Sequence, residues 1–140
     1  MSELIVSYLI RRHQGTAHGF RVYADGQVES YQSSRYVKAA DGSITTESLT
    51  PDWYPLTSLD GSQVQHAKRL VIESGAPQMP TDLNESRQPD TSKRSSAEWQ
   101  IGTQDGIKTI IVPEWVPDSP HGKALVELES QINEIIHAAT

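Results

Sequence analysis

Short runs rich in β-branched and aromatic residues recur along the chain, and one of them alternates between apolar and polar positions, which is the pattern of β-strands. The segment Leu4–Arg12 is rich in β-branched and aromatic residues and lacks a helix start signal, so it predicts a strand. In Phe20–Asp25, the residues Phe20, Val22 and Ala24 fall on one face. The same reasoning predicts further strands at Gln27–Lys38, Ser43–Leu49, Glu98–Thr103 and Ile107–Val112.

Three Asp-Gly pairs separate these runs, at Asp25-Gly26, Asp41-Gly42 and Asp105-Gly106. Asp-Gly favours tight hairpin turns, because those turns need a positive φ that glycine adopts without strain. The pairs therefore predict that consecutive strands are joined as hairpins in an antiparallel meander.

Two segments follow the helical period instead. In Leu59–Ser74, Thr57 or Ser58 is predicted to cap the helix, Asp60 falls in its first turn, and Gly75 ends it. The apolar face of this helix consists of Val64, Ala67, Leu70 and Val71.

The second helix lies near the C-terminal end of the chain. Asp118 or Ser119 is placed to cap it, and Pro120 suits its first turn, where a missing N–H has no cost. Its apolar residues form one continuous stripe, which predicts a helix packed along its whole length: Leu125, Leu128, Ile132, Ile135, Ile136 and Ala139.

Together these elements predict a single α+β domain over residues 1–140, in the order β-β-β-β-α-loop-β-β-α. A mainly antiparallel sheet of five or six strands would carry both helices on one face, because each helix has one apolar stripe to bury. The segment Ala76–Ser96 is rich in proline and small polar residues and predicts a long mobile surface loop. Loops lengthen at small entropic cost, so we interpret it as a tolerated insertion rather than a functional loop.

One short pattern occurs twice. Residues 51–55 read Pro-Asp-Trp-Tyr-Pro and residues 113–117 read Pro-Glu-Trp-Val-Pro, each between a hairpin and a predicted helix. We interpret them as strand-to-helix joints, either from a weak ββα duplication or by convergence, in which the tryptophan covers the gap between sheet and helix. The alternative is a recognition surface made of two exposed tryptophans, Trp53 and Trp115.

The sheet face without helices is expected to be partly solvated. Tyrosine and arginine on an open face are a candidate partner-binding surface, with Tyr23 and Arg35 as its candidate contact residues. An ordinary one-sided antiparallel sheet has the same appearance, and that interpretation is favoured. The polar alternates are Arg21, Tyr23, Gln27, Glu29, Tyr31 and Arg35.

The composition excludes some kinds of site and some classes of partner. The formal net charge is -6 and there is no cysteine, so disulfides and thiolate metal sites are excluded. An acidic chain argues against nucleic-acid binding and favours a basic protein partner. No apolar run approaches the roughly 18 residues of a membrane span. The first residues do not resemble a signal peptide, so a soluble cytoplasmic protein is expected.

One loop contains the clearest candidate ligand-binding residues. Arg11, Arg12, His13 and His18 flank glycines and would suit an anion or small ligand. The loop lacks the glycine pattern of known phosphate-binding motifs, and adjacent arginines on a strand point to opposite faces. No third ligand completes a histidine metal site, and no cofactor is predicted.

The sequence is compatible with two main functions. The first is a non-catalytic protein-binding or regulatory module, of which an inhibitor or immunity-type protein is a sharper form. The second is a small ligand-binding domain or enzyme with its site near residues 11–18. A third possibility is a subunit whose sheet edge or second helix packs against its own copy. The absence of any catalytic motif favours the first.

Overall fold

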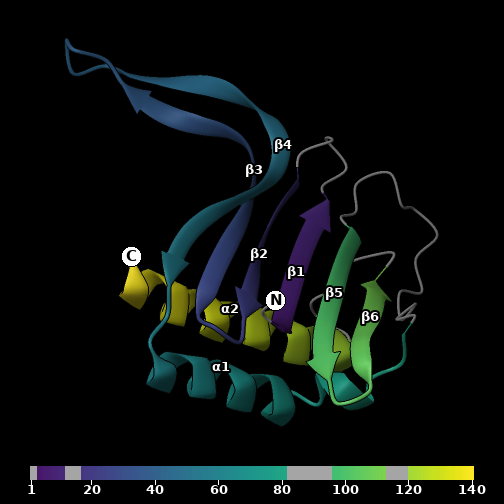
Figure 1. The fold of residues 1–140 in the computed structure, drawn as a ribbon. Coiled ribbons are helices and arrows are strands. Elements are labelled where there is room, and N and C mark those ends of the chain that lie inside the picture. Colours follow the sequence, from purple (N-terminus) through teal and green to yellow (C-terminus); the bar gives the residue numbers. More distant parts are fainter. Residues whose placement is uncertain (1–2, 12–16, 82–95, 113–119) are drawn as a thin grey trace.

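The computed structural model describes residues 3–11, 17–81, 96–112 and 120–140. Within these residues, six antiparallel strands form one sheet and two α-helices form a second layer, which confirms the predicted α+β fold and element order (Figure 1). The strands are β1 Leu4–Arg11, β2 Ala17–Tyr23, β3 Gln27–Lys38, β4 Ile44–Ser58, β5 Ser96–Thr103 and β6 Gly106–Val112. The helices are α1 Gly61–Glu73, the short 3-10 helix η1 Ala76–Gln78, and α2 Pro120–Ala139.

The strand order in the sheet is β4-β3-β2-β1-β5-β6. Strands β1 to β4 form a meander that ends at one edge, and the chain then passes through α1 and returns to place β5 beside β1. The strand β1 therefore lies in the interior of the sheet, between β2 and β5.

Both helices cover the same face of the sheet. On β1, Val6, Tyr8 and Ile10 belong to the core, and the neighbouring strands add Phe20 and Trp99. Trp99 is fully buried, with its ring centre 4.6 Å from that of Tyr8. All the predicted apolar residues of α1 and α2 are buried in this core except Ala139, which is partly buried against it.

Helix α1 begins later than predicted and has a different cap. Asp60 is the N-cap, in a capping box with Gln63: the Gln63 backbone N–H donates to Asp60, and the Gln63 side chain accepts from the Asp60 N–H. Thr57 is not free to cap, because it lies in β4 and its hydroxyl donates to the Ala139 carbonyl, 2.9 Å away. Gly75 follows the helix with a φ of +80°, so the predicted glycine stop is confirmed.

The repeated pattern at residues 51–55 is not a strand-to-helix joint. It lies inside β4, which runs on past the predicted end at Leu49 to Ser58. The strand β4 is an edge strand, and an edge tolerates proline because one side of its backbone has no strand to bond. Residues 113–117 lie outside the described residues, so the ββα duplication stays a prediction.

The first part of the predicted loop is packed rather than exposed. Ala76 and Met79 are buried in the core. The Ile111 backbone N–H donates to the Thr81 carbonyl, 2.8 Å away, so this segment runs along β6. Residues 82–95 lie outside the described residues. Among the helices that are described, none is long and apolar enough to cross a membrane.

Candidate functional site: a hairpin arm and its base

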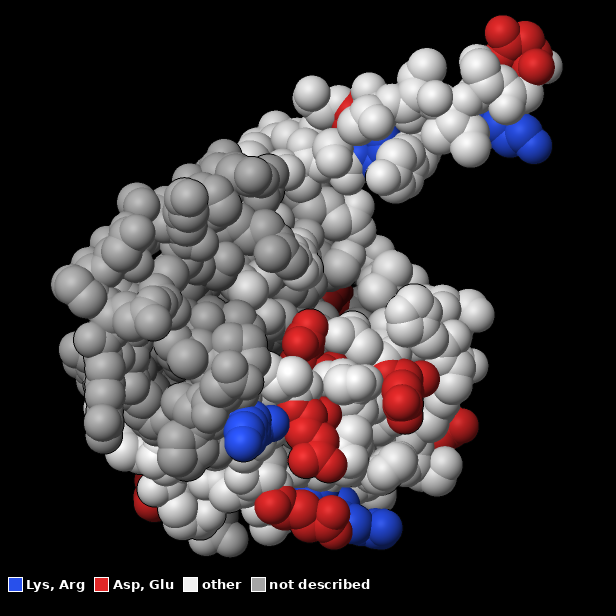
Figure 2. Space-filling model, turned by 180° about the vertical axis from the view of Figure 1, so that it is seen from behind, with Lys and Arg blue, Asp and Glu red and all other residues white. Residues whose placement is uncertain are grey.

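The strands β3 and β4 extend well beyond the rest of the sheet. The strand β2 pairs with β3 only from Gly19↔Tyr31 to Val22↔Val28. Beyond Tyr31, β3 pairs with β4 alone among the described strands. Residues 32–52 therefore form a two-stranded ribbon, here named the arm, which curves away from the sheet (Figure 1), and its outer part stands clear of the other described residues (Figure 2).

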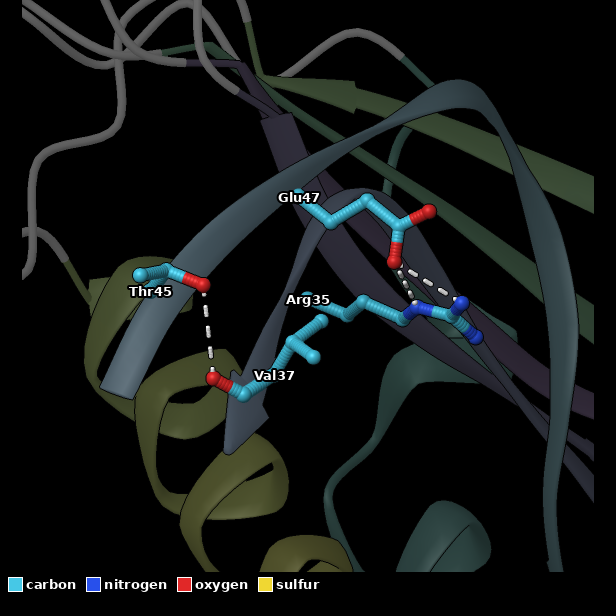
Figure 3. Close-up of polar contacts among 4 residues, drawn as sticks. All are labelled: Arg35, Val37, Thr45 and Glu47. Carbon is cyan, nitrogen blue, oxygen red and sulfur yellow. Dashed lines mark hydrogen bonds and ion pairs between the residues drawn. The ribbon is translucent and has the colours of Figure 1, made fainter. Parts of the chain in front are cut away.

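Two large apolar side chains are exposed on one face of the arm. Tyr36 is 83% exposed and Ile44 is 68% exposed. Tyr36 pairs with Thr46, and Ile44 pairs with Lys38, so Tyr36 and Ile44 are diagonal neighbours on the same face. We name these two residues the arm patch. The other face carries the Arg35–Glu47 ion pair at 2.8 Å, and beside it the Thr45 hydroxyl donates to the Val37 carbonyl (Figure 3).

The tip of the arm is a well-bonded turn. The Ala39 N–H donates to the Ser43 carbonyl over 2.8 Å, and the Gly42 N–H donates to the Ala39 carbonyl over 3.0 Å. The Asp41 carboxylate accepts from both the N–H and the hydroxyl of Ser43, and these bonds lower the pKa of Asp41. The hairpin predicted from Asp41-Gly42 is confirmed.

The base of the arm is a bend in β4. Between Gln32↔Asp52 and Ser34↔Ser48, β4 contains more residues than β3, and a second irregularity follows between Val28 and Glu29. Extra residues of this kind bend and twist a strand. Residues 52–55 lie between the two irregularities, and the Tyr54 hydroxyl donates to the Thr50 carbonyl over 2.6 Å, which ties the bend together.

An aromatic and cationic cluster fixes this bend to the sheet. The Arg21 guanidinium lies 4.0 Å from the centre of the Trp53 ring, and Tyr31 meets the same ring edge-on with centres 5.3 Å apart. Arg21 follows Phe20, which faces the helices, so the cluster lies on the opposite, helix-free face. We name Arg21, Tyr31 and Trp53 the arm base. Trp53 is half-buried against Arg21 and does not fill a gap between sheet and helix.

Tyr23 and Glu29 form a second polar contact on the helix-free face. The Tyr23 hydroxyl donates to Glu29 over 3.0 Å. Burial, followed by the hydrogen bond to Glu29 and the charge of Glu29, raises the pKa of Tyr23. Among the candidate partner-binding residues, Tyr23 therefore lies on the sheet, while Arg35 lies out on the arm and is paired with Glu47. Trp115 lies outside the described residues.

The described residues of the candidate ligand loop do not converge. Arg11 pairs with Ala17, and the next pair along is Ile10↔His18. Ile10 is in the core, so His18 points to the helix side and Arg11 points to the opposite face. Arg11 and His18 therefore lie on opposite faces of the sheet and cannot contribute to one site. Arg12 and His13 lie outside the described residues.

Two surface cavities, here called hollows, lie next to the helices. One has a volume of 170 Å³, lies between the sheet and α2, and includes His18, Ser30, Glu129 and Asn133 in its lining. The other has a volume of 370 Å³ and lies between α1 and α2, lined by Gln63, His66, Leu70, Gln131, Glu134, Ile135 and Ala138. Over the described ranges, no group of three or more His, Cys, Asp or Glu side chains is placed to hold a metal ion.

The chain matches no protein-family model, and no curated protein is significantly similar to it. Its function is therefore inferred from its own geometry. The sequence reasoning missed Tyr36 and Ile44, although it contained a usable signal. The predicted strand Gln27–Lys38 is about twice as long as Phe20–Asp25 beside it, so part of it had to extend past its neighbour.

Proposed function

We propose that this chain is a non-catalytic protein-binding or regulatory module that docks through its arm. The observation that carries the proposal is the exposure of Tyr36 and Ile44 together on one face of a ribbon that stands clear of the sheet. A two-stranded ribbon alone is marginally stable in water, so the arm gains little from being long. Large apolar side chains placed on such a projection are typical of a contact surface.

The base of the arm supports this function. The contacts of Trp53 with Arg21 and Tyr31 join the bend of β4 to strands β2 and β3 of the sheet. The bond from Tyr54 to Thr50 closes the bend itself. A projection held in one direction loses less conformational entropy on binding than a flexible one, so these contacts favour association.

Charge supports a basic partner. The arm carries two basic and three acidic side chains, a net charge of -1, whereas the whole chain carries -6. Most of the negative charge therefore belongs to the rest of the protein, and the charged side chains on the side shown in Figure 2 are mostly acidic. This field steers a basic protein toward the molecule, and the nearly neutral arm makes the close contact. A basic enzyme whose cleft accepts the arm would make the chain an inhibitor or immunity-type protein.

The test is capture of a partner by the purified, tagged protein from cells of its source, followed by affinity measurement with the purified partner. The double variant Tyr36→Ser with Ile44→Ser removes the arm patch. Its matched control is Ile72→Ser, because Ile72 is 69% exposed on α1, away from the arm. We expect at least about a tenfold loss of affinity in the arm variant and none in the control. Equal affinity in both variants would overturn the proposal.

A second candidate function is small-ligand binding in the 170 Å³ hollow next to His18. Polar groups of Ser30 and Asn133 meet aromatic walls there, which is the composition of a ligand site. The hollow is smaller than the roughly 300–1,000 Å³ of usual ligand pockets, which ranks this function second. A thermal-shift screen of small acids and amines tests it. A stabilising compound whose effect disappears in Asn133→Leu but persists in Gln131→Leu would favour it.

A further inference from the structure

The free strand edges of this sheet differ in how they are protected. In the edge strand β4, Pro51 lies in one register irregularity and Pro55 borders the other, so the part of β4 that runs along the sheet is a poor template for another strand. The edge strand β6 is partly covered, since Ile111 donates to the Thr81 carbonyl and the Lys108 ammonium donates to the Pro77 carbonyl.

The outer edge of β3 in the arm has no such protection among the described residues. Hydrogen-bonded pairs alternate along an antiparallel ladder, and the bond from Ala39 to Ser43 marks one of them. Counting back from that pair, Ser34, Tyr36 and Lys38 direct their backbone N–H and C=O groups outward. The sequence from Gln32 to Lys38 contains no proline, and the pairing with β4 is regular from Ser34 to Lys38.

We propose that this edge pairs with the same edge of a second copy of the chain, giving a two-fold dimer joined by a four-stranded ribbon in the order β4-β3-β3-β4. A two-fold axis makes the new strand pair antiparallel and closes the assembly, because the paired edges are then used up. The outer edge of β4 in the arm is also regular from Ile44 to Ser48, before Pro51 interrupts it. A head-to-tail chain of copies through that edge is therefore the alternative that the Ser48→Pro variant below tests.

The side chains select a register for this pairing. With the axis at Tyr36, the two Tyr36 rings face each other as an aromatic cross-strand pair, and Ser34 faces Lys38. An axis at Arg35 would place two guanidinium groups opposite each other, and like charges directly opposite are destabilising. The Tyr36 register also reduces the solvent exposure of Tyr36, which is 83% in the single chain.

The net charge of the arm is small enough for two arms to pair. Within the arm, Glu47 neutralises Arg35, and the net charge is only -1 of the chain's -6. The outer part of the arm stands clear of the other described residues (Figure 2). Charges that lie farther apart than about 8–10 Å are largely screened at physiological salt, so the acidic bodies need not repel the dimer apart. The two arm patches then share one face of the ribbon. The dimer pairs through the backbone edge of β3 and uses one residue of the arm patch, Tyr36, at its axis, and it goes beyond the function proposed above.

The test is sedimentation equilibrium of the full chain over a wide range of concentration, with two proline variants. Ser34 and Ser48 face each other across the arm, so Ser34→Pro blocks the outer edge of β3 and Ser48→Pro blocks the outer edge of β4. We expect a dimer for the wild type and for Ser48→Pro. We expect association about tenfold weaker or more for Ser34→Pro, because the substitution removes an N–H from each copy. A wild type that stays monomeric, or an equal loss in both variants, would overturn the proposal.

A cross-linking experiment covers the case in which a proline variant fails to fold. The chain has no cysteine, so Tyr36→Cys introduces a single thiol. Hydrogen-bonded residues across an antiparallel pair have Cα atoms about 5.5 Å apart, which is within disulfide reach. We expect Tyr36→Cys to form a disulfide-linked dimer under mild oxidation and Thr46→Cys, opposite it on β4, to remain mostly monomeric. Equal cross-linking of both would exclude the β3 edge. Partner capture by the wild type is scored separately, so failure of the dimer leaves the proposed docking function testable.

Discussion

The Arg21 guanidinium lies over the Trp53 ring, 4.0 Å from its centre. Arg21 belongs to β2 and Trp53 to β4, two strands that do not pair with each other because β3 lies between them. The contact therefore spans β3 on the helix-free face and reaches the bend at which the arm leaves the sheet. It links the direction of the arm to the body of the protein.

A double-mutant cycle on this pair should show coupling. We expect Arg21→Met and Trp53→Leu to be less destabilising together than the sum of the single variants, by about 0.5–1.5 kcal/mol, because each removes the same cation–π contact. Urea unfolding measures the free energies. The control cycle is Arg35→Met with Glu47→Gln, whose side chains are 59% and 49% exposed. An exposed ion pair of that kind should couple by only about 0.2–0.5 kcal/mol. Equal coupling in the two cycles would contradict the prediction.

Tryptophan fluorescence should separate Trp99 from Trp53. Trp99 is fully buried, whereas Trp53 is half-buried on the helix-free face. In a Trp115→Phe background, we expect Trp53→Phe to leave a blue-shifted emission that acrylamide quenches weakly. Trp99→Phe should leave a redder and more strongly quenched emission from Trp53. Identical quenching in the two variants would be inconsistent with the packing described.

The strands, helices and hairpins could be predicted because their signals are local. The strand pattern of Gln27–Lys38 and the Asp41-Gly42 pair depend only on neighbouring residues, and both elements formed as predicted. The role of residues 51–55 depends instead on which strand lies beside β4 and in what register. The same five residues fit a joint or a bent strand equally well until Arg21 and Tyr31 are placed next to Trp53. The helix-free face was predictable from alternation, but the arm required a comparison of strand lengths.

Gly19 should not tolerate a side chain. It lies in β2 opposite Leu9, and a methyl group on its Cα would overlap the Tyr8 carbonyl oxygen. That oxygen belongs to the backbone of the central strand, so the clash can be relieved only by moving β1 or β2. We expect Gly19→Ala to lower the free energy of unfolding by about 3 kcal/mol or more. The control is Gly61→Ala, where the space is open and the site is helical. It should stay within about 0.5 kcal/mol of the wild type or exceed it.

The capping box of α1 should make stability depend on acidic pH. Hydrogen bonds from the Gln63 backbone and the Ser62 hydroxyl lower the pKa of Asp60 below its ordinary value of 3.8. A carboxylate whose pKa is lowered in the folded state contributes stability above its unfolded pKa, and that contribution disappears as pH falls through the folded pKa. We expect Asp60→Ala to lower the urea midpoint at neutral pH and to approach the wild type in strong acid. Asp60→Asn, which keeps a cap without a charge, should lose less at neutral pH. A constant difference between wild type and Asp60→Ala at every pH would refute this role.

Tyr23 should produce the opposite dependence, at alkaline pH. Burial and the acceptor Glu29 raise its pKa above the ordinary value of 10.0, so the folded protein holds the neutral phenol. Its contribution to stability is complete below the unfolded pKa and is lost as pH rises through the folded pKa, because the unfolded chain releases the proton first. Absorbance titration of tyrosinate should therefore show a late component that is missing in Tyr23→Phe. The fall in stability above the ordinary tyrosine pKa should also be shallower in that variant. Tyr36→Phe is the matched control, since Tyr36 is 83% exposed on the arm, and it should leave the late component in place. If the late component were lost in Tyr36→Phe instead, it would belong to Tyr36, and this result would contradict the Tyr23–Glu29 bond.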